Sequence, residues 1–239
     1  MNTFTLQGKK VVVIGGSSGI GLAIAKAAAE AKARVVIGGR SPQKLEDALA
    51  DIEENVLAYP VDLTQEDSIA DFFKREGTVD HLVISGSSIT SGAFHELPIS
   101  QAMQSMDSKF WGPYRAIKVA SLQPTGSITL FSGVLSRRPT SGMVAIAAIN
   151  AAVEGLGKAL AVELAPVRVN VIAPGLVKTA AYSNMPEEQR EAMYQNTAAQ
   201  LPARRIGTPE DIAAMTLQVM TNPYMTGVVV DIDGGSLLV

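Results

Sequence analysis

Short apolar runs alternate with longer amphipathic stretches along the whole chain. The runs are typical of strands buried on both faces of a parallel sheet, and the stretches between them carry apolar residues at helical spacing. We expect strands at Lys10–Ile14, Arg34–Ile37, Val56–Pro60, His81–Ile84, Ser127–Phe131, Arg168–Ile172 and Val228–Ile232. We expect helices at Gly19–Ala31, Pro42–Ile52, Gln65–Arg75, Ile99–Ser121, Val144–Leu164, Pro186–Ala199 and Pro209–Met220.

This alternation predicts an α/β fold. Strands that are separated by helices favour a doubly wound parallel sheet of about seven strands with helices on both faces. The chain has 239 residues and a hydrophobic content of 47%, which suits one domain with a large core, so we expect residues 1–239 to form a single domain.

Two stretches break the regular pattern. Gly112-Pro113 falls inside an expected helix and predicts a kink or a break there. Residues 176–201 are poorly patterned and contain the charged segment PEEQRE, so they are a candidate for a mobile flap over a ligand site. The alternative for this stretch is an ordinary surface helix.

Charge and hydropathy argue against two classes of partner. The net charge is −3 and there is no basic block, so we expect no nucleic acid. We find no apolar run that should span a bilayer, and Met1–Gly8 is polar rather than signal-like, so we expect no membrane association.

The chain has no cysteine and only two histidines, His81 and His95. This excludes disulfides, thiol nucleophiles, cysteine–zinc sites and a three-histidine zinc centre, so we expect no metal site. The lack of cysteine is also consistent with a cytoplasmic protein.

The most informative segment is VVVIGGSSGIGLAIAK at residues 11–26, in which a strand leads through a Gly-rich turn into a helix. Gly15 allows the sharp turn, Gly19 lets the backbone approach phosphates, and Gly21 lets the helix pack close to the strand. The free N–H groups at the helix start then face the anion. The segment predicts nucleotide binding; the alternative is a Gly-rich turn without a ligand.

The next two strand ends bear on which nucleotide binds. The second strand ends in Gly39 and Arg40, where an NAD site commonly has a carboxylate for the ribose hydroxyls. A guanidinium can clamp a 2′-phosphate, which favours NADP(H) over NAD(H); alternatively, Arg40 covers the adenine or points to water. Asp62 follows the third strand and can accept a bond from the adenine amino group, or it caps the helix start at Thr64–Asp67.

These motifs carry a family resemblance from about Leu6 to the end of the chain. Besides Gly15-x3-Gly19-x-Gly21 there are Asp62-Leu63, the segment NVIAPGLVKT at 170–179, and Thr226-Gly227 followed by DIDGG at 231–235. The chain resembles the short-chain dehydrogenase/reductase family. The resemblance implies a Rossmann-type domain and a homotetramer or homodimer built on the two long central helices and the last strand.

The resemblance also implies how the coenzyme is held. In the family the Pro-Gly segment binds the nicotinamide carboxamide through backbone at the Val177 position and through the Thr179 hydroxyl. The cofactor-binding residues expected for NADP(H) are Gly15, Ser17, Ser18, Gly19, Ile20, Gly21, Arg40, Asp62, Leu63, Gly86, Pro174, Gly175, Val177 and Thr179.

The catalytic positions depart from the family. The family uses an Asn, a Ser, a Tyr and a Lys; the flanking residues place Lys109, Gly133, Ile146 and Asn150 at these four positions in turn. The Asn-Asn-Ala-Gly motif after the fourth strand also differs, and reads Ile84-Ser85-Gly86-Ser87. Hydride transfer to a carbonyl leaves negative charge on oxygen, and Ile146 can neither protonate nor stabilise it.

Lys109 and Asn150 have exchanged the family's Asn and Lys, which keeps one ammonium and one amide in the same volume. We predict that Lys109 supplies the cation and the proton, because burial would lower its pKa toward a useful range. Asn150 would bond the nicotinamide ribose, and Ser132, or less favourably Ser85 or Ser87, would bind the substrate oxygen. Alternatively, Lys109 pairs structurally with a carbonyl or carboxylate, and Ser132 bonds backbone.

The leading hypothesis is therefore an NADP(H)-dependent oxidoreductase with a rearranged proton-delivery group. Its partner would be a small-molecule substrate, namely a carbonyl, alcohol, imine or activated alkene. The second hypothesis is an inactive NADP(H)-binding sensor or partner subunit, which the loss of Tyr and Ser at positions 146 and 133 favours. A third is a non-redox enzyme on the same scaffold, such as a dehydratase or isomerase.

Overall fold

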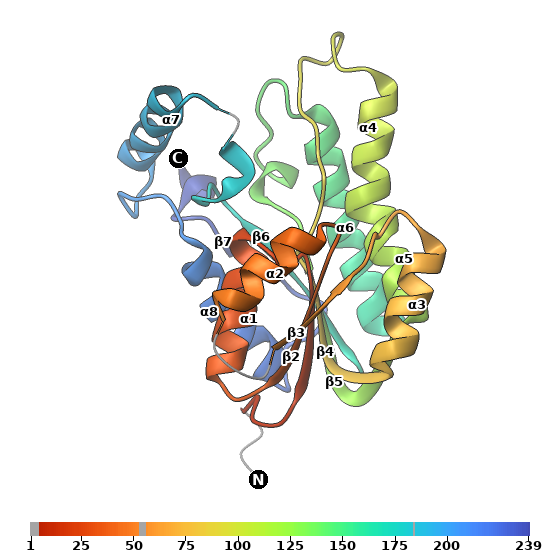
Figure 1. Ribbon diagram of the computed structural model, residues 1–239. Helices are drawn as coiled ribbons and strands as arrows, with labels where there is room; N and C mark the ends of the chain where they lie inside the picture. Colours follow the sequence, from red (N-terminus) through yellow and green to blue (C-terminus); the bar gives the residue numbers. More distant parts are fainter. Residues whose placement is uncertain (1–4, 53–55, 184) are drawn as a thin grey trace.

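The computed structural model describes residues 5–52, 56–183 and 185–239. It has one parallel seven-stranded sheet in the order β3-β2-β1-β4-β5-β6-β7, with helices on both faces (Figure 1). The predicted doubly wound α/β fold is confirmed. The strands are β1 (Lys10–Ile14), β2 (Arg34–Gly39), β3 (Val56–Pro60), β4 (Thr78–Ile84), β5 (Ser121–Phe131), β6 (Arg168–Pro174) and β7 (Val229–Ile232).

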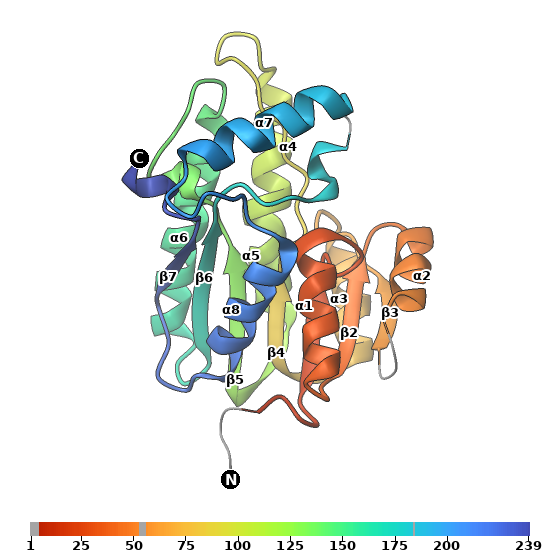
Figure 2. The same cartoon turned by 90° about the vertical axis from the view of Figure 1, so that its left-hand side faces the viewer.

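Two groups of helices cover the sheet. The helices α1 (Gly19–Glu30), α2 (Pro42–Ala50) and α8 (Pro209–Thr221) pack on one face. The other face carries α3 (Glu66–Glu76), α5 (Gly112–Val119) and α6 (Val144–Glu163), and Figure 2 shows α1 and α8 in front of the strands with these helices behind them. The remaining elements are α4 (Ile99–Met106), α7 (Glu187–Gln200), a π-helical turn η1 (Asp107–Trp111), and the short 3₁₀ turns η2 (Val134–Ser136), η3 (Ala180–Tyr182) and η4 (Ser236–Leu238).

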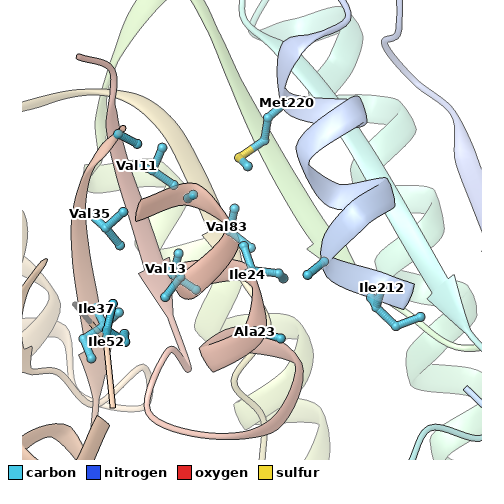
Figure 3. Packing of buried hydrophobic residues seen from close by; sticks show 14 of the residues in the cluster. Val11, Val13, Ala23, Ile24, Val35, Ile37, Ile52, Val83, Ile212 and Met220 are labelled. Carbon is cyan, nitrogen blue, oxygen red and sulfur yellow. The ribbon is translucent and has the colours of Figure 1, made fainter. Parts of the chain in front are cut away.

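The side chains of β1 point alternately to the two faces of the sheet, and the core is correspondingly divided into two clusters. Val11 and Val13 point to the α1–α8 side, where they meet Ile24 and Met220 (Figure 3), whereas Val12 packs with the α3–α5–α6 side. All three β1 valines are fully buried. This explains why the strand reads as an unbroken apolar run instead of an alternating one.

The chain order makes a crevice between β1 and β4. From β1 the chain builds outward through β2 to β3, and then returns to place β4 on the other side of β1. The connections from β1 and β4 therefore leave in opposite directions at the carboxyl ends, which is where ligands bind in open parallel sheets.

Three sequence expectations need correction. The helix expected at Ile99–Ser121 is divided into α4, η1 and α5, and it ends at Val119 because Ser121 already pairs with Thr78 in the sheet. The strands β4 and β5 consequently begin earlier than expected. The expected break at Gly112-Pro113 is confirmed, but it takes the form of a π-turn directly before Gly112.

The expectation that no run should span a bilayer also needs correction. By length and composition alone, α6 could cross a membrane. Its apolar residues include several alanines and the buried Ile149 and Val153, and it also buries Asn150.

The two central strands are joined through a buried histidine. The Nδ1 atom of His81 on β4 lies 2.8 Å from the hydroxyl oxygen of Ser127 on β5. Burial is the main reason that the pKa of His81 falls from 6.5 to about 4; the nearby Asp80 opposes this shift. The ring is therefore neutral in the folded protein at neutral pH.

This neutral histidine should make the fold sensitive to acid. Between pH 6.5 and about 4 the unfolded chain binds a proton on His81 and the folded protein does not. The free energy of unfolding should therefore fall by up to about 3 kcal/mol as the pH is lowered through this window. Urea unfolding measures this pH dependence in the wild type and in His81→Gln. In the variant the amide can still bond Ser127 but cannot titrate. Identical pH dependence in both proteins would contradict the assignment.

Candidate functional site

A cleft of about 730 Å³ runs along the carboxyl edge of the sheet. Its lining comes from the β1–α1 turn, from the ends of β2 and β3, from the segment after β4, and from η3. Most of the residues predicted to bind the coenzyme line it: Gly15, Ser17, Ser18, Gly19, Ile20, Gly21, Arg40, Asp62, Leu63, Gly86 and Thr179. The structure thus brings these residues together from segments far apart in the sequence.

The floor of the cleft is a contact between backbones. Gly15 has a φ of +88°, and a Cβ added there would overlap the backbone of Gly86. A Cβ on Gly21 would overlap the carbonyl of Gly15. Gly15 and Gly21 thus have the roles predicted for them: a sharp turn, and close packing of the helix against the strand.

The start of α1 offers free donors to the cleft. Ser18 is the N-cap residue of α1, and its side chain makes no capping bond. Gly19 has a φ of +53°, and a Cβ there would lie 3.4 Å from a side-chain carbon of Thr179, across the cleft. The amides of the first helical turn and the positive end of the helix dipole form an anion-binding surface of the size of a phosphate.

The end of β2 adds positive charge. Arg40 is exposed, and among the residues described it has no ion pair or side-chain hydrogen bond. Ser41 and Lys44 line the cleft beside it, and the Ser41 hydroxyl accepts a bond from the Lys44 backbone amide at 3.4 Å. The coenzyme-binding residues predicted from the sequence do not include Ser41 and Lys44, although a cap residue and a lysine one turn later were a usable signal.

Asp62 lies in the turn before α3 and faces the cleft. It lines the cleft next to Leu63 and Thr64. Its Oδ1 also accepts bonds from the backbone amide and the hydroxyl of Thr64, at 2.9 and 2.8 Å. This turn holds the carboxylate in place at the cleft wall.

A smaller cavity of about 160 Å³ adjoins the cleft. The two share Ile20, Ser85, Gly86 and Ser87 as lining. The inner part is lined mainly by apolar side chains at the ends of β4 and β5 and from the helices behind them. Its polar contributors include Lys109 and Ser132.

Lys109 lies on the π-turn, which follows from Pro113. A proline has no N–H to donate to the carbonyl four residues earlier, here that of Lys109, and its ring crowds that carbonyl. The hydrogen bonds of the helix therefore span five residues here instead of four, and the Gly112 amide bonds to the carbonyl of Asp107. Such turns are frequent at functional sites, and here the turn directs Lys109 into the cavity that Pro113 also lines.

The Lys109 ammonium has an unusual environment. It donates to the backbone carbonyl of Ser132 at 3.0 Å, and among the residues described it makes no ion pair. Burial lowers the pKa of Lys109 from 10.5 to about 8. The carbonyl contact agrees with the structural alternative raised for this lysine, and the cavity lining agrees with the chemical one.

Ser132 is held by hydrogen bonds to both its side chain and its backbone. Its hydroxyl donates to Glu154 Oε1 at 3.0 Å, and its carbonyl accepts from Lys109. Glu154 also accepts from Ser136 at 2.6 Å and pairs with Arg137 at 3.0 Å, and Arg137 reaches Asp231 as well. The partner of the Ser132 hydroxyl is thus a carboxylate and not backbone. The sequence analysis did not identify Glu154, because nothing in the pattern of α6 shows which way this side chain points.

Asn150 and Gly133 occupy a shared space. The Asn150 amide nitrogen donates to the Gly133 carbonyl at 3.3 Å, and a Cβ on Gly133 would lie 2.9 Å from that nitrogen. Asn150 is 1% exposed, and its Oδ1 has no hydrogen-bond partner among the residues described. Asn150 and Ile146 are both buried but do not line the cavity.

The segment after β6 closes the other side of the site. Pro174 lines the inner cavity, and Gly175 packs against the backbone of Asp233. Val177 is buried and pairs with Gly207. It is not among the residues that line the cleft or the inner cavity. Figures 1 and 2 show α7, the main element of the proposed flap, beyond the carboxyl end of the sheet. Whether residues 176–201 move stays a prediction.

Comparison with known proteins gives matches over almost the whole chain. A family model described as Enoyl-(Acyl carrier protein) reductase matches residues 14–236. The chain is 33% identical to the short-chain dehydrogenase/reductase ucsE of Acremonium sp, over 98% of this chain and 97% of that protein.

Two solved structures also match almost the whole chain. A small-chain dehydrogenase in complex with NADPH is 38% identical, with a TM-score of 0.82 over 98% of this chain and 100% of that one. The MalC reductase/Diels-Alderase from Malbranchea aurantiaca is 28% identical, with a TM-score of 0.93 over 100% of both chains.

The Gly133–Asn150 contact gives a test of the site's packing. Gly133→Ala should destabilise the protein by about 1–3 kcal/mol, because the added methyl crowds the buried amide of Asn150. In the double variant Gly133→Ala/Asn150→Ala much of this cost should disappear, which urea unfolding in a double-mutant cycle measures. Gly155→Ala is the matched control: this α6 glycine has open space, so alanine should stabilise. Additive effects at 133 and 150 would refute the shared space.

Proposed function

The chain belongs to the short-chain dehydrogenase/reductase family, and from this premise we propose that it is an NADP(H)-dependent oxidoreductase in which Lys109 delivers the proton. The observation that carries the proposal is the Lys109 ammonium in a cavity that opens into the nucleotide cleft, with its pKa lowered to about 8. The substrate class would be a small carbonyl or alcohol, or an imine.

The cleft fits the coenzyme. The glycine floor leaves room where side chains would block a diphosphate, and the start of α1 supplies amide donors for it. Arg40, with Ser41 and Lys44, would hold the 2′-phosphate, and Asp62 with Leu63 the adenine. The Thr179 hydroxyl and the backbone at Val177 would hold the carboxamide. When bound, the coenzyme supplies the hydride.

Lys109 would act on the substrate oxygen. As negative charge develops there, the ammonium neutralises it and donates its proton, and the Ser132 carbonyl keeps the ammonium oriented. A pKa of about 8 leaves Lys109 mostly protonated at neutral pH yet able to give its proton up.

Ser132 and Asn150 would have supporting roles. The Ser132 hydroxyl gives its hydrogen to Glu154, so toward a substrate it can only accept a hydrogen bond. We therefore assign its contribution mainly to the carbonyl that bonds Lys109. The Oδ1 of Asn150 has no partner among the residues described, but it is buried and does not line the cavity, so we assign Asn150 to packing against Gly133 and not to the ribose.

A second candidate is a non-catalytic NADP(H)-binding sensor or partner subunit. Ile146 and Gly133, which stand at the positions predicted for Tyr and Ser, supply no acidic group. In such a protein Lys109 would have only a structural role, through its bond to Ser132.

In either case we propose a homodimer or homotetramer in the cytoplasm. Half-exposed Trp111 and Tyr114, beside exposed Val119, form an apolar strip along η1 and α5 that a second copy could cover.

Coenzyme preference is the first prediction. The protein should bind NADPH more tightly than NADH, and Arg40→Ala should weaken NADPH binding by about 10-fold to 100-fold through loss of charge-assisted bonds to the 2′-phosphate. Binding of NADH should change by less than about twofold. Calorimetric titration of both coenzymes measures this, with Arg34→Ala, at the opposite end of β2, as control. Tighter NADH binding by the wild type would refute the assignment.

Proton delivery is the second prediction. Lys109→Met should lower kcat for carbonyl reduction by about 100-fold or more with little change in NADPH affinity. The wild-type rate should fall as the pH rises through about 8, because the acid form of Lys109 is lost. Lys109→Arg keeps the positive charge but gives up no proton, so it should react more slowly than the wild type and without this fall. Single-turnover NADPH oxidation with a panel of aldehydes, ketones and imines measures the rates.

The exposed Lys118 on α5 gives the matched control, Lys118→Met, which should behave as the wild type. Equal rates in Lys109→Met and the wild type would remove Lys109 from the mechanism. NADPH binding without turnover over the whole panel would favour the sensor.

A further inference from the structure

Lys109 differs from the other lysines whose contacts are described. Lys9, Lys10, Lys26 and Lys178 each pair with a carboxylate. Lys109 bonds only to a carbonyl oxygen, which stabilises an ammonium without a full counter-charge. Among these five lysines, Lys109 therefore loses its proton at the smallest electrostatic cost.

The cavity gives this amine a route to small molecules. It adjoins the open cleft, with which it shares Ile20, Ser85 and Gly86 as lining. Beyond this mouth the lining is largely apolar, with Leu130 and Phe131 near Ser132. A cavity of about 160 Å³ with such walls favours a small, uncharged, apolar molecule over a charged one.

We propose that Lys109 is a carbonyl-capturing nucleophile, whose neutral amine condenses with a small aliphatic aldehyde in this cavity to form an imine. The nitrogen lone pair forms a C–N bond to the carbonyl carbon, and the oxygen becomes a hydroxyl. Water then leaves with that oxygen and with the two hydrogens of the amine, and a C=N bond remains. No oxidant or reductant takes part in this step.

The electrostatics of the site support this reactivity. A pKa of about 8 leaves a far larger neutral fraction at neutral pH than the ordinary value of 10.5 does. Desolvation in an apolar pocket is a recognised way to activate a lysine for Schiff-base chemistry. The chain contains no cysteine, so no thiol competes for the aldehyde.

The inference goes beyond the proposed function and does not require turnover. Below its pKa Lys109 would serve as the acid that reduction needs, and above it as the nucleophile that captures a carbonyl. A reductase with this lysine would therefore have a covalent side reaction with its own class of substrate. The two roles can fail separately.

Reductive trapping tests the proposal. The coenzyme-free full-length protein is treated with propanal and sodium cyanoborohydride, and peptide mapping by mass spectrometry follows the propyl group at each lysine. At neutral pH, Lys109 should be modified about tenfold faster than exposed Lys118, with a pH midpoint of about 8.

The controls separate the site from general lysine reactivity. Lys109→Arg should lose the fast internal site, and saturating NADP⁺ should slow modification of Lys109 but not of Lys118, because the cavity opens through the cleft. Modification of Lys109 no faster than that of Lys118 in the unaltered protein would overturn the proposal. So would a fast internal site that persists in Lys109→Arg.

The outcome is distinguishable from that of the proposed function. Fast trapping at Lys109, together with unchanged carbonyl reduction in Lys109→Met, would uphold the capture and reject proton delivery. Slow trapping, together with loss of reduction in Lys109→Met, would reject the capture and uphold proton delivery.

Discussion

The site depends on a contact between three backbone segments that have no side chains between them. At the carboxyl edge of the sheet, Gly15 lies against Gly86 and Gly21 lies against Gly15, so closely that a methyl group at Gly15 or Gly21 would overlap backbone. This contact holds the start of α1 over the crevice between β1 and β4 and aims its free amides into the cleft. A larger residue at either position would lift the helix from the sheet and remove both the phosphate surface and the mouth of the inner cavity.

The residues in and around the inner cavity depend on one another. Pro113 imposes the π-turn that carries Lys109, and Lys109 bonds the carbonyl of Ser132. Gly133 lacks a side chain where the amide of Asn150 takes the space. Together these contacts form one packed arrangement. The Glu154 carboxylate stabilises this arrangement by accepting hydrogen bonds from the hydroxyls of Ser132 and Ser136.

Much of the fold could be predicted because strand and helix periods are local properties. The buried valines of β1, the glycine turn and the break before Pro113 are all visible as sequence patterns. The early start of β5 was not, because Ser121 joins the sheet through pairing with Thr78 and not through an apolar run of its own. Glu154 and Lys44 were missed because their importance depends on where a side chain points in three dimensions. The contact between Asn150 and Gly133 likewise exists only after α6 has packed beside the end of β5.

We expect a phosphate-bearing dinucleotide to lie along the cleft with its reactive ring at the mouth of the Lys109 cavity. A crystal structure of the complex with NADP⁺ would show this. The diphosphate should lie at the start of α1, the 2′-phosphate beside Arg40, and the nicotinamide ring over the cavity with the Lys109 amine facing it. A nicotinamide ring held elsewhere, or a Lys109 amine that points away from the ring behind a closed cavity, would refute this mode of binding.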